Sequence, residues 1–213
     1  MGRRGSYRGG GDSLMFFKKT SAGIEYLIAG LGNPGARYRD TRHNAGFMAA
    51  DVLCEKYDIR LKSRFGGHFG TFKAENMSFG LLMPETYMNL SGQSVGQAMR
   101  FYKLPPERCI ILFDDVTLPL GRLRVRRSGS HGGHNGMRNI IDYCGGDGFP
   151  RVKIGVGSKP HENMELADYV TSRFKSDELP VIKSAAELAA EAALYIAREG
   201  PDAAMGIYNG RGV

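Results

Sequence analysis

Short apolar segments alternate with segments of helical period from residue 24 onward. Residues 24–31, 109–113 and 151–157 are apolar runs of strand length, while residues 44–57, 91–102 and 179–198 repeat apolar side chains every three or four positions. Residues 69–75 and 77–83 resemble two further strands joined at Asn76, residues 122–127 alternate as a strand, and residues 135–143 fit a short helix. This alternation predicts an α/β fold in a single domain, with a mixed, mostly parallel central sheet and helices on both faces.

The composition is that of a globular protein and argues against several other classes. The chain of 213 residues is 42% hydrophobic and 24% charged, close to the average for such proteins. It has no run of eighteen apolar residues, so we expect no membrane span and no membrane partner. Cys54, Cys109 and Cys144 are scattered without a Cys-x-x-Cys spacing, which argues against a disulfide framework or a zinc knuckle and favours the reducing cytoplasm.

The first 22 residues differ from the rest in being rich in Gly, Arg and Ser. They carry five basic residues and one acidic residue, so +4 of the formal net charge of +7 belongs to them. We predict a disordered basic tail at residues 1–22 and one folded domain over residues 23–213. A transit peptide is one alternative, and an upstream start with Met15 as a second start is the favoured one. The remaining +3 is weak evidence for a polyanionic partner.

A glycine motif follows the first predicted strand. Residues 30–35 match G-x-G-x-x-G, which in dinucleotide-binding proteins opens a helix on the pyrophosphate. Here Pro34 stands where that helix should donate N–H groups, and Asp51 and Glu55, the acids about twenty positions on, lie inside a predicted helix. We therefore expect a tight turn that presents Asn33 at the carboxyl end of a central strand. A nicotinamide-dependent oxidoreductase is the less favoured alternative.

His43 lies in a polar segment ten residues after Asn33, directly before a predicted helix. A lone histidine is more often a surface or core residue than a catalyst. A helix N-terminus, however, disfavours the protonated imidazole, and a neutral ring is what a general base requires. We therefore interpret His43 as a candidate base.

Asp114 and Asp115 end the apolar segment at residues 109–113. Adjacent strand residues point to opposite faces, so at most one of these carboxylates faces a given site. Solvated loop acids are the commonest case, and a magnesium site is another alternative. A single carboxylate that orients a histidine is the interpretation that fits a base elsewhere in the chain.

Two segments place side-chain amides close to predicted helix starts. Asn89 precedes the helix at 91–102, and Asn135 ends a glycine-rich loop at residues 128–136. Capping is the ordinary role of such residues, and binding a carbonyl or a developing oxyanion is the functional one. His131 and His134 suggest zinc, but no Cys, Asp or Glu stands near them in sequence, so we predict no metal. With no G-x-S-x-G motif and no cysteine paired with a base, water is the expected nucleophile.

Arginines alternate along residues 122–127. Arg122, Arg124 and Arg126 would share one face of a strand at steps of about 6.6 Å, a row that can follow successive phosphates. A solvated strand face is the ordinary alternative. Because the segment leads directly into the glycine loop that carries Asn135, we predict an anion-binding stripe, which Lys153 on a later strand extends.

These motifs, taken in order, resemble the bacterial-type peptidyl-tRNA hydrolase family. The resemblance covers about residues 24–210. Its matching segments are Gly-Asn-Pro-Gly at 32–35, Thr-Arg-His-Asn-Ala-Gly at 41–46, Tyr-Met-Asn-Leu-Ser-Gly at 87–92 and His-Gly-Gly-His-Asn-Gly at 131–136, together with Tyr38, Asp114, Leu118, Pro119 and Gly121. Any one segment is a weak signal, whereas the ordered set is highly specific.

The resemblance implies an enzyme that hydrolyses the ester between peptide and tRNA in peptidyl-tRNA lost from stalled ribosomes. It implies a monomer without a cofactor. The family's catalytic histidine falls on His43 and its supporting aspartate on Asp114. Substrate-binding positions fall on Asn33, Tyr38, Tyr87, Asn89 and Asn135, and tRNA-binding positions fall on Arg124, Arg126 and Lys153.

One departure from the family pattern is Thr117, which stands where a second acid is usual, three residues after Asp114. A secondary support of that loop is therefore expected to be lost. The alternative from a different functional class is a non-catalytic RNA-binding protein, since the same scaffold resembles chloroplast intron-splicing relatives. Turnover on N-blocked aminoacyl-tRNA distinguishes the two.

Overall fold

The computed structural model describes residues 23–213, so the predicted tail at 1–22 lies outside the described residues. The centre is a seven-stranded sheet in the order β2-β3-β4-β1-β5-β7-β6. The strands are β1 Tyr26–Gly30, β2 Lys62–Arg64, β3 Gly67–Ala74, β4 Met77–Pro84, β5 Cys109–Asp115, β6 Leu123–Arg126 and β7 Arg151–Gly155. The helices are α1 Ala45–Tyr57, α2 Ser91–Tyr102, α3 Asn135–Cys144, α4 Leu166–Thr171, α5 Leu179–Glu199 and α6 Pro201–Tyr208, with 3-10 turns η1 Ala36–Tyr38, η2 Arg42–Asn44, η3 Met88–Leu90 and η4 Pro106–Arg108.

The sheet is parallel in its centre and antiparallel at both edges. Strands β4, β1, β5 and β7 run parallel, whereas β3 pairs antiparallel with β4, β2 with β3, and β6 with β7. The hairpin between β3 and β4 closes at Glu75 and Asn76, which both have positive φ, at the joint that the sequence predicts. The carboxyl ends of the four parallel strands meet at one edge, where open α/β sheets bind ligands.

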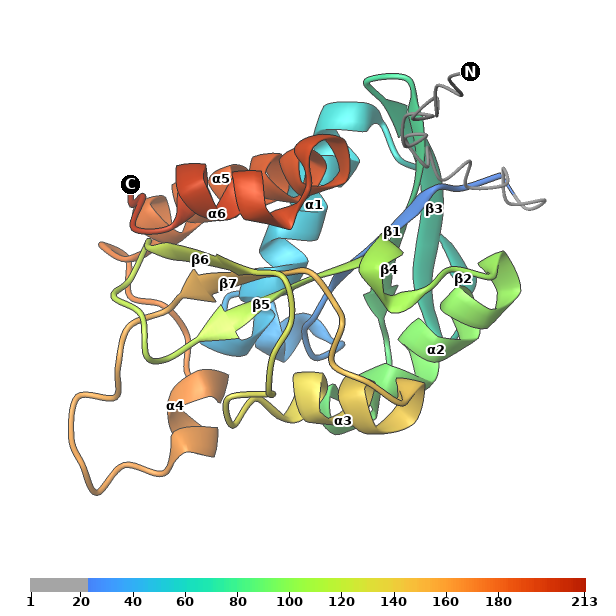
Figure 1. Cartoon of the computed structure of the whole chain (residues 1–213). Helices are drawn as coiled ribbons and strands as arrows, with labels where there is room; N and C mark the ends of the chain where they lie inside the picture. Colours follow the sequence, from blue (N-terminus) through green and yellow to red (C-terminus); the bar gives the residue numbers. More distant parts are fainter. Residues whose placement is uncertain (1–22) are drawn as a thin grey trace, which may run out of the picture.

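Helices cover both faces of the sheet, as predicted. Helices α1, α5 and α6 lie on one face, and α2 and α3 on the other (Figure 1). One apolar core joins α1 and the alanine-rich α5 to the sheet, and a second joins α2 and α3 to its opposite face. None of the helices within residues 23–213 is long and apolar enough to cross a membrane.

Glycines let α1 approach β1 and β5 closely. A Cβ on Gly46 would lie 2.3 Å from the Leu112 carbonyl oxygen, and one on Gly30 would lie 2.4 Å from the carbonyl oxygen of Gly46. A Cβ on Gly32 would meet the ring of Phe47 at 2.5 Å. The first α-helix after the glycine motif begins only at Ala45, so the structural premise of the dinucleotide alternative is wrong. These glycines serve the packing of helix on strand.

Several elements were not predicted, because their sequences carry no clear period. Strand β2 is exposed at all three residues, and α4 has only six. Gly200 and Pro201 end α5 as expected, but Pro201 also begins α6, because proline suits the first position of a helix. Strand β6 begins at Leu123, so the expected place of Arg122 within the strand is wrong; its guanidinium donates to the Gly210 carbonyl.

Candidate active site

A histidine and an aspartate that are far apart in sequence meet at the carboxyl edge of the sheet. Nδ1 of His43 lies 2.8 Å from Oδ1 of Asp114, and both side chains are buried. His43 belongs to the 3-10 turn η2, directly before α1, and Asp114 is the last residue but one of strand β5. If the Nδ1 proton is donated to the carboxylate, Nε2 is left as an acceptor, which is the tautomer that a general base needs.

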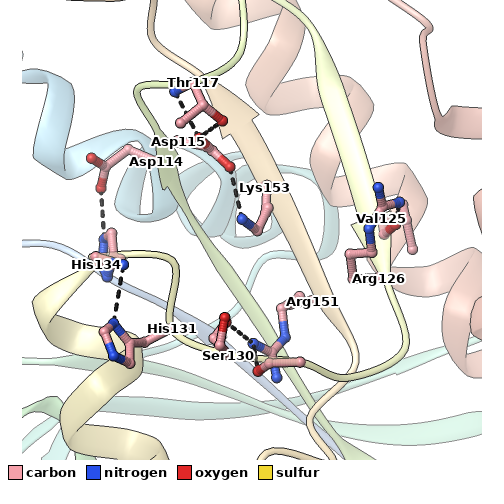
Figure 2. A network of polar contacts seen from close by, with 12 residues as sticks. Asp114, Asp115, Thr117, Val125, Arg126, Ser130, His131, His134, Arg151 and Lys153 are labelled. Atoms are coloured by element: carbon pink, nitrogen blue, oxygen red, sulfur yellow. Dashed lines mark hydrogen bonds and ion pairs between the residues drawn. The ribbon is translucent and has the colours of Figure 1, made fainter.

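A second histidine, His134, binds the same carboxylate oxygen, and Figure 2 shows its contact with Asp114. Nε2 of His134 lies 3.0 Å from Oδ1 of Asp114, while its Nδ1 accepts the backbone N–H of Met137 at the start of α3. Because Nδ1 accepts, Nε2 carries the proton and donates it to Asp114. Sequence reasoning missed this role; the one local signal for it is the N-cap position of His134.

The charge of Asp114 decides the protonation of the pair. Burial lowers the pKa of His43, but the charge and hydrogen bond of Asp114 outweigh it, so the pKa lies above the ordinary value. Burial raises the pKa of Asp114, and His43 and His134 together hold it well below its usual range. The expectation that the helix N-terminus would lower the pKa of His43 is therefore wrong, because a carboxylate in contact acts more strongly than a helix end.

Asn33 is held in place by a neighbour of His43. The backbone N–H of Asn33 donates to Oδ1 of Asn44 at 2.8 Å, and Nδ2 of Asn44 donates to the Asn33 carbonyl at 3.1 Å. The Asn33 side chain in turn accepts the Met88 N–H through Oδ1, which leaves its NH₂ group for a ligand. Sequence reasoning missed the positioning role of Asn44.

The segments that carry the three predicted asparagines meet at Met88. Asn33 bonds to the Met88 backbone, Asn89 is the next residue along, and a Cβ on Gly136 would lie 2.6 Å from Sδ of Met88. Asn135, which precedes Gly136, is exposed, as is Asn89. The fold therefore brings these segments together across more than 100 residues of sequence.

A cavity of about 250 Å³ lies over the pair. His43, Asp114, Asn135 and Lys153 are among its lining residues, with the glycine loop and α4 around them. Asn33 lines a neighbouring cavity instead. Neither cavity is lined by Tyr38, which is half-buried beside Arg37, or by Tyr87, which is 55% exposed.

The predicted basic residues lie on one face of the sheet. Arg124 pairs in register with Lys153 across β6 and β7, and Arg126 pairs with Arg151. Arg124, Arg126 and Lys153 are half-buried, and Arg151 is buried. The two acids that end β5 have different partners: Asp114 binds the histidines, while Asp115 binds Lys153. Both nevertheless line the same cavity, so the expectation that at most one of them faces a given site is wrong.

Arg151 anchors the glycine loop, as Figure 2 shows for its bond to Ser130. Its guanidinium also donates to the carbonyls of Gly129, Asp147 and Phe149. Burial lowers the pKa of Arg151 to about 10, so the group stays charged at neutral pH. Nothing in its sequence context predicts this role.

The fold also changes the argument about metals. His43, Asp114 and His134 each offer a ligand atom within 4.8 Å of the others, and could hold a metal ion. Asp114 lies 20 residues before His134 along the chain, so the sequence around the two histidines of the glycine loop does not reveal it as a ligand. In the structure these atoms bond to one another, and a metal would have to displace the protons between them.

The fold and the site define an α/β protein with a buried histidine–aspartate pair at the carboxyl edge of its parallel strands. The family model described as "Peptidyl-tRNA hydrolase" matches residues 27–213, and the chain belongs to this family. Peptidyl-tRNA hydrolases of Clostridium botulinum and Clostridium novyi are each 45% identical to it over 186 residues, which cover 87% of this chain and 97% and 98% of theirs. The crystal structure of peptidyl-tRNA hydrolase from Acinetobacter baumannii matches with a TM-score of 0.82 and 36% identity, covering 90% of this chain and 97% of that one.

Proposed function

We propose that this protein hydrolyses the ester bond between peptide and tRNA, with His43 as the general base. The observation that carries the proposal is the hydrogen bond between Nδ1 of His43 and the buried carboxylate of Asp114. It orients the ring and leaves Nε2 to act on water beside the cavity. The family membership of the chain and the names of its relatives supply the substrate class.

The reaction needs one base and a few fixed dipoles. Nε2 of His43 takes a proton from water, and the hydroxide attacks the ester carbonyl. The amides of Asn33, Asn89 and Asn135 bind the peptide or the developing oxyanion. The terminal ribose oxygen leaves with the proton held by His43, so that free tRNA and the peptide acid result. The negative charge of Asp114 stabilises the imidazolium in between.

The basic face next to the cavity is the proposed site for tRNA. Lys153 lines the cavity itself, and Arg124 lies beside it in register, so a backbone whose end reaches His43 would pass over both. Tyr38 and Tyr87 offer rings for contacts with the RNA end. Cys54, Cys109 and Cys144 are free thiols, which fits the reducing cytoplasm, and we propose that the protein acts there as a monomer.

The test is hydrolysis of an N-acetyl-aminoacyl-tRNA beside the unblocked form, with and without a chelator. Wild type should cleave the blocked ester in both conditions. His43→Ala should lose about 10²–10⁴ in rate while it still binds tRNA. His161→Ala, which alters an exposed histidine in a loop, is the matched control. Binding of tRNA by wild type without turnover would support the non-catalytic alternative, and full activity of His43→Ala would remove the base.

A further inference from the structure

Lys153 is the one Lys or Arg among the residues that line the cavity over His43 and Asp114, yet an internal carboxylate already binds it. Its Nζ lies 2.8 Å from Oδ2 of Asp115, with the two side chains 17% and 6% exposed. The ammonium lines the same cavity as His43 and lies over the ring of Phe113. A Cβ on Gly132 would be 3.5 Å from Nζ, so the glycine loop passes directly beside the ion pair.

Thr117 fixes the orientation of the Asp115 carboxylate. Its backbone N–H and its hydroxyl both donate to Oδ1, at 2.8 Å and 2.7 Å. With Oδ1 occupied, Oδ2 is the oxygen that remains for Lys153 (Figure 2). Burial raises the pKa of Asp115, but the bonds from Lys153 and Thr117 lower it below its ordinary value. Thr117, which stands where the family pattern has a second acid, thus holds Asp115 through two hydrogen bonds.

The carboxylate lies at one end of a group of cations. Arg124 is the register partner of Lys153, and Arg126 and Arg151 form the next pair on the same face. Among these four cations, only Lys153 has an ion pair with a residue in the 23–213 range. Its carboxylate partner is therefore a fixed negative charge in direct contact with the proposed tRNA surface, and it repels any phosphate that approaches the ammonium.

We propose that Asp115, oriented by Thr117, is an internal counter-ion that limits the affinity of the protein for tRNA. Without RNA, the carboxylate satisfies Lys153. When RNA binds, a phosphate shares or takes over the ammonium, and the nearby carboxylate weakens that contact. Product tRNA carries the same phosphates as the substrate, so a carboxylate that competes for Lys153 favours release after hydrolysis. This inference rests on the proposed function, because it presumes that the basic face binds tRNA.

The experiment measures the dissociation constant of uncharged tRNA against salt concentration, which needs no turnover. Asp115→Asn keeps the shape and the Thr117 bonds but removes the charge. We expect it to bind tRNA about 5-fold more tightly at low salt, with a salt slope steeper by up to about 0.9. Thr117→Val should tighten binding about 2-fold, because the carboxylate loses the hydroxyl donor, keeps only the backbone N–H and can rotate away from Lys153. In both variants, slower release of product tRNA should lower the steady-state kcat. The rate of the chemical step, measured in a single turnover by rapid quench, should stay unchanged.

Two further variants separate this effect from a general change of charge. Asp202→Asn removes an exposed carboxylate that pairs with Arg127, and it should leave the affinity for tRNA within about 1.5-fold of wild type because exposed pairs contribute little. Lys153→Met should weaken binding, and in the double variant with Asp115→Asn the tightening should vanish. If Asp115→Asn no longer tightens tRNA binding once Lys153 is replaced, the tightening acts through the Lys153 ammonium.

Unchanged or weaker tRNA binding by a folded Asp115→Asn, with folding checked by thermal unfolding, overturns the proposal. If that variant does not fold, an unchanged affinity in Thr117→Val overturns it instead. The proposed function fails differently: wild type would then not hydrolyse the ester of N-acetyl-aminoacyl-tRNA, whether or not it binds tRNA. Tighter binding in Asp115→Asn that persists in the Lys153→Met background would also contradict the counter-ion role.

Discussion

At the level of single residues, the proposed chemistry depends on the Asp114 carboxylate, which His43 and His134 share. Oδ1 of Asp114 receives both His43 and His134, so two imidazoles hold its negative charge in place. The same charge raises the pKa of His43. A general base with a raised pKa is a stronger base, but it is protonated over a wider range of pH.

The first prediction concerns pH. The base must be neutral, so activity should rise with pH through the pKa of His43 and be lost as pH falls below it. Because that pKa is raised, the apparent pKa of the kcat/KM profile should lie above about 6.5. Asp114→Asn should lower kcat/KM by about 10²–10⁴ and move the residual profile to lower pH. A pH profile of both proteins on the N-blocked ester checks this, and a midpoint below 6 in wild type would contradict it.

At the level of elements, the site is assembled from the ends of strands and the starts of helices. Asp114 lies at the carboxyl end of strand β5, His43 lies in the turn before α1, and His134 caps α3. The glycine loop between β6 and α3 has no regular structure of its own, and Arg151 on β7 fixes it through backbone carbonyls. The position of His134 and Asn135 therefore depends on a neighbouring strand.

Removing that anchor should destabilise the fold. Arg151→Met buries an apolar side chain and leaves four backbone carbonyls, that of buried Phe149 among them, without this donor, and it should lower the free energy of unfolding by on the order of 3 kcal/mol. In a domain of this size the Tm falls by roughly 2–4 °C per kcal/mol. Arg127→Met, which alters an exposed side chain, should stay within about 0.5 kcal/mol. Urea and thermal unfolding of the variants measure the difference, and equal stability would show that the loop has no need of the guanidinium.

In the whole molecule, the sheet and its two helical layers hold His43 and Asp114 together at one edge. Helix α1 packs so closely on β1 and β5 that only glycine fits at position 46. Gly46 packs against the carbonyl oxygen of Leu112. His43 lies three residues before Gly46, and Asp114 lies two residues after Leu112. The distance between base and carboxylate is thus set by the packing of a helix on two strands.

Gly46→Ala should consequently affect both stability and activity. Its Cβ would lie within 2.6 Å of three backbone atoms, and relieving that overlap should cost about 1–3 kcal/mol and displace His43. Gly206→Ala is the matched control, because it also lies in a helix and a Cβ there meets nothing within 4 Å. It should be neutral or stabilise by up to about 1 kcal/mol. Chemical denaturation and ester hydrolysis test the pair of variants, and equal behaviour would refute the packing argument.

Local patterns in the sequence predicted most of the elements and the places of the site residues along them. The helical period of the apolar residues predicted a helix at residues 91–102, and α2 has these same bounds. Asn33, His43 and Asn135 were expected near the ends of strands and helices because glycine and polar residues interrupt the apolar runs there. Strand β2 and helix α4 were missed because they bury too little apolar surface to leave a pattern. Such signals act over a few residues, so they carry no information about which ends meet.

Only the tertiary structure decided the partners. His43 and Asp114 are 71 residues apart in the sequence. His134, at the end of the glycine loop, also binds Asp114, and Lys153, on strand β7, binds Asp115. The direction of the pKa shift at His43 also reverses the expectation from its helix, because burial and charge depend on neighbours from other elements. Propensity and period are encoded locally, whereas ion pairs, close approaches and protonation arise from packing between segments distant along the chain.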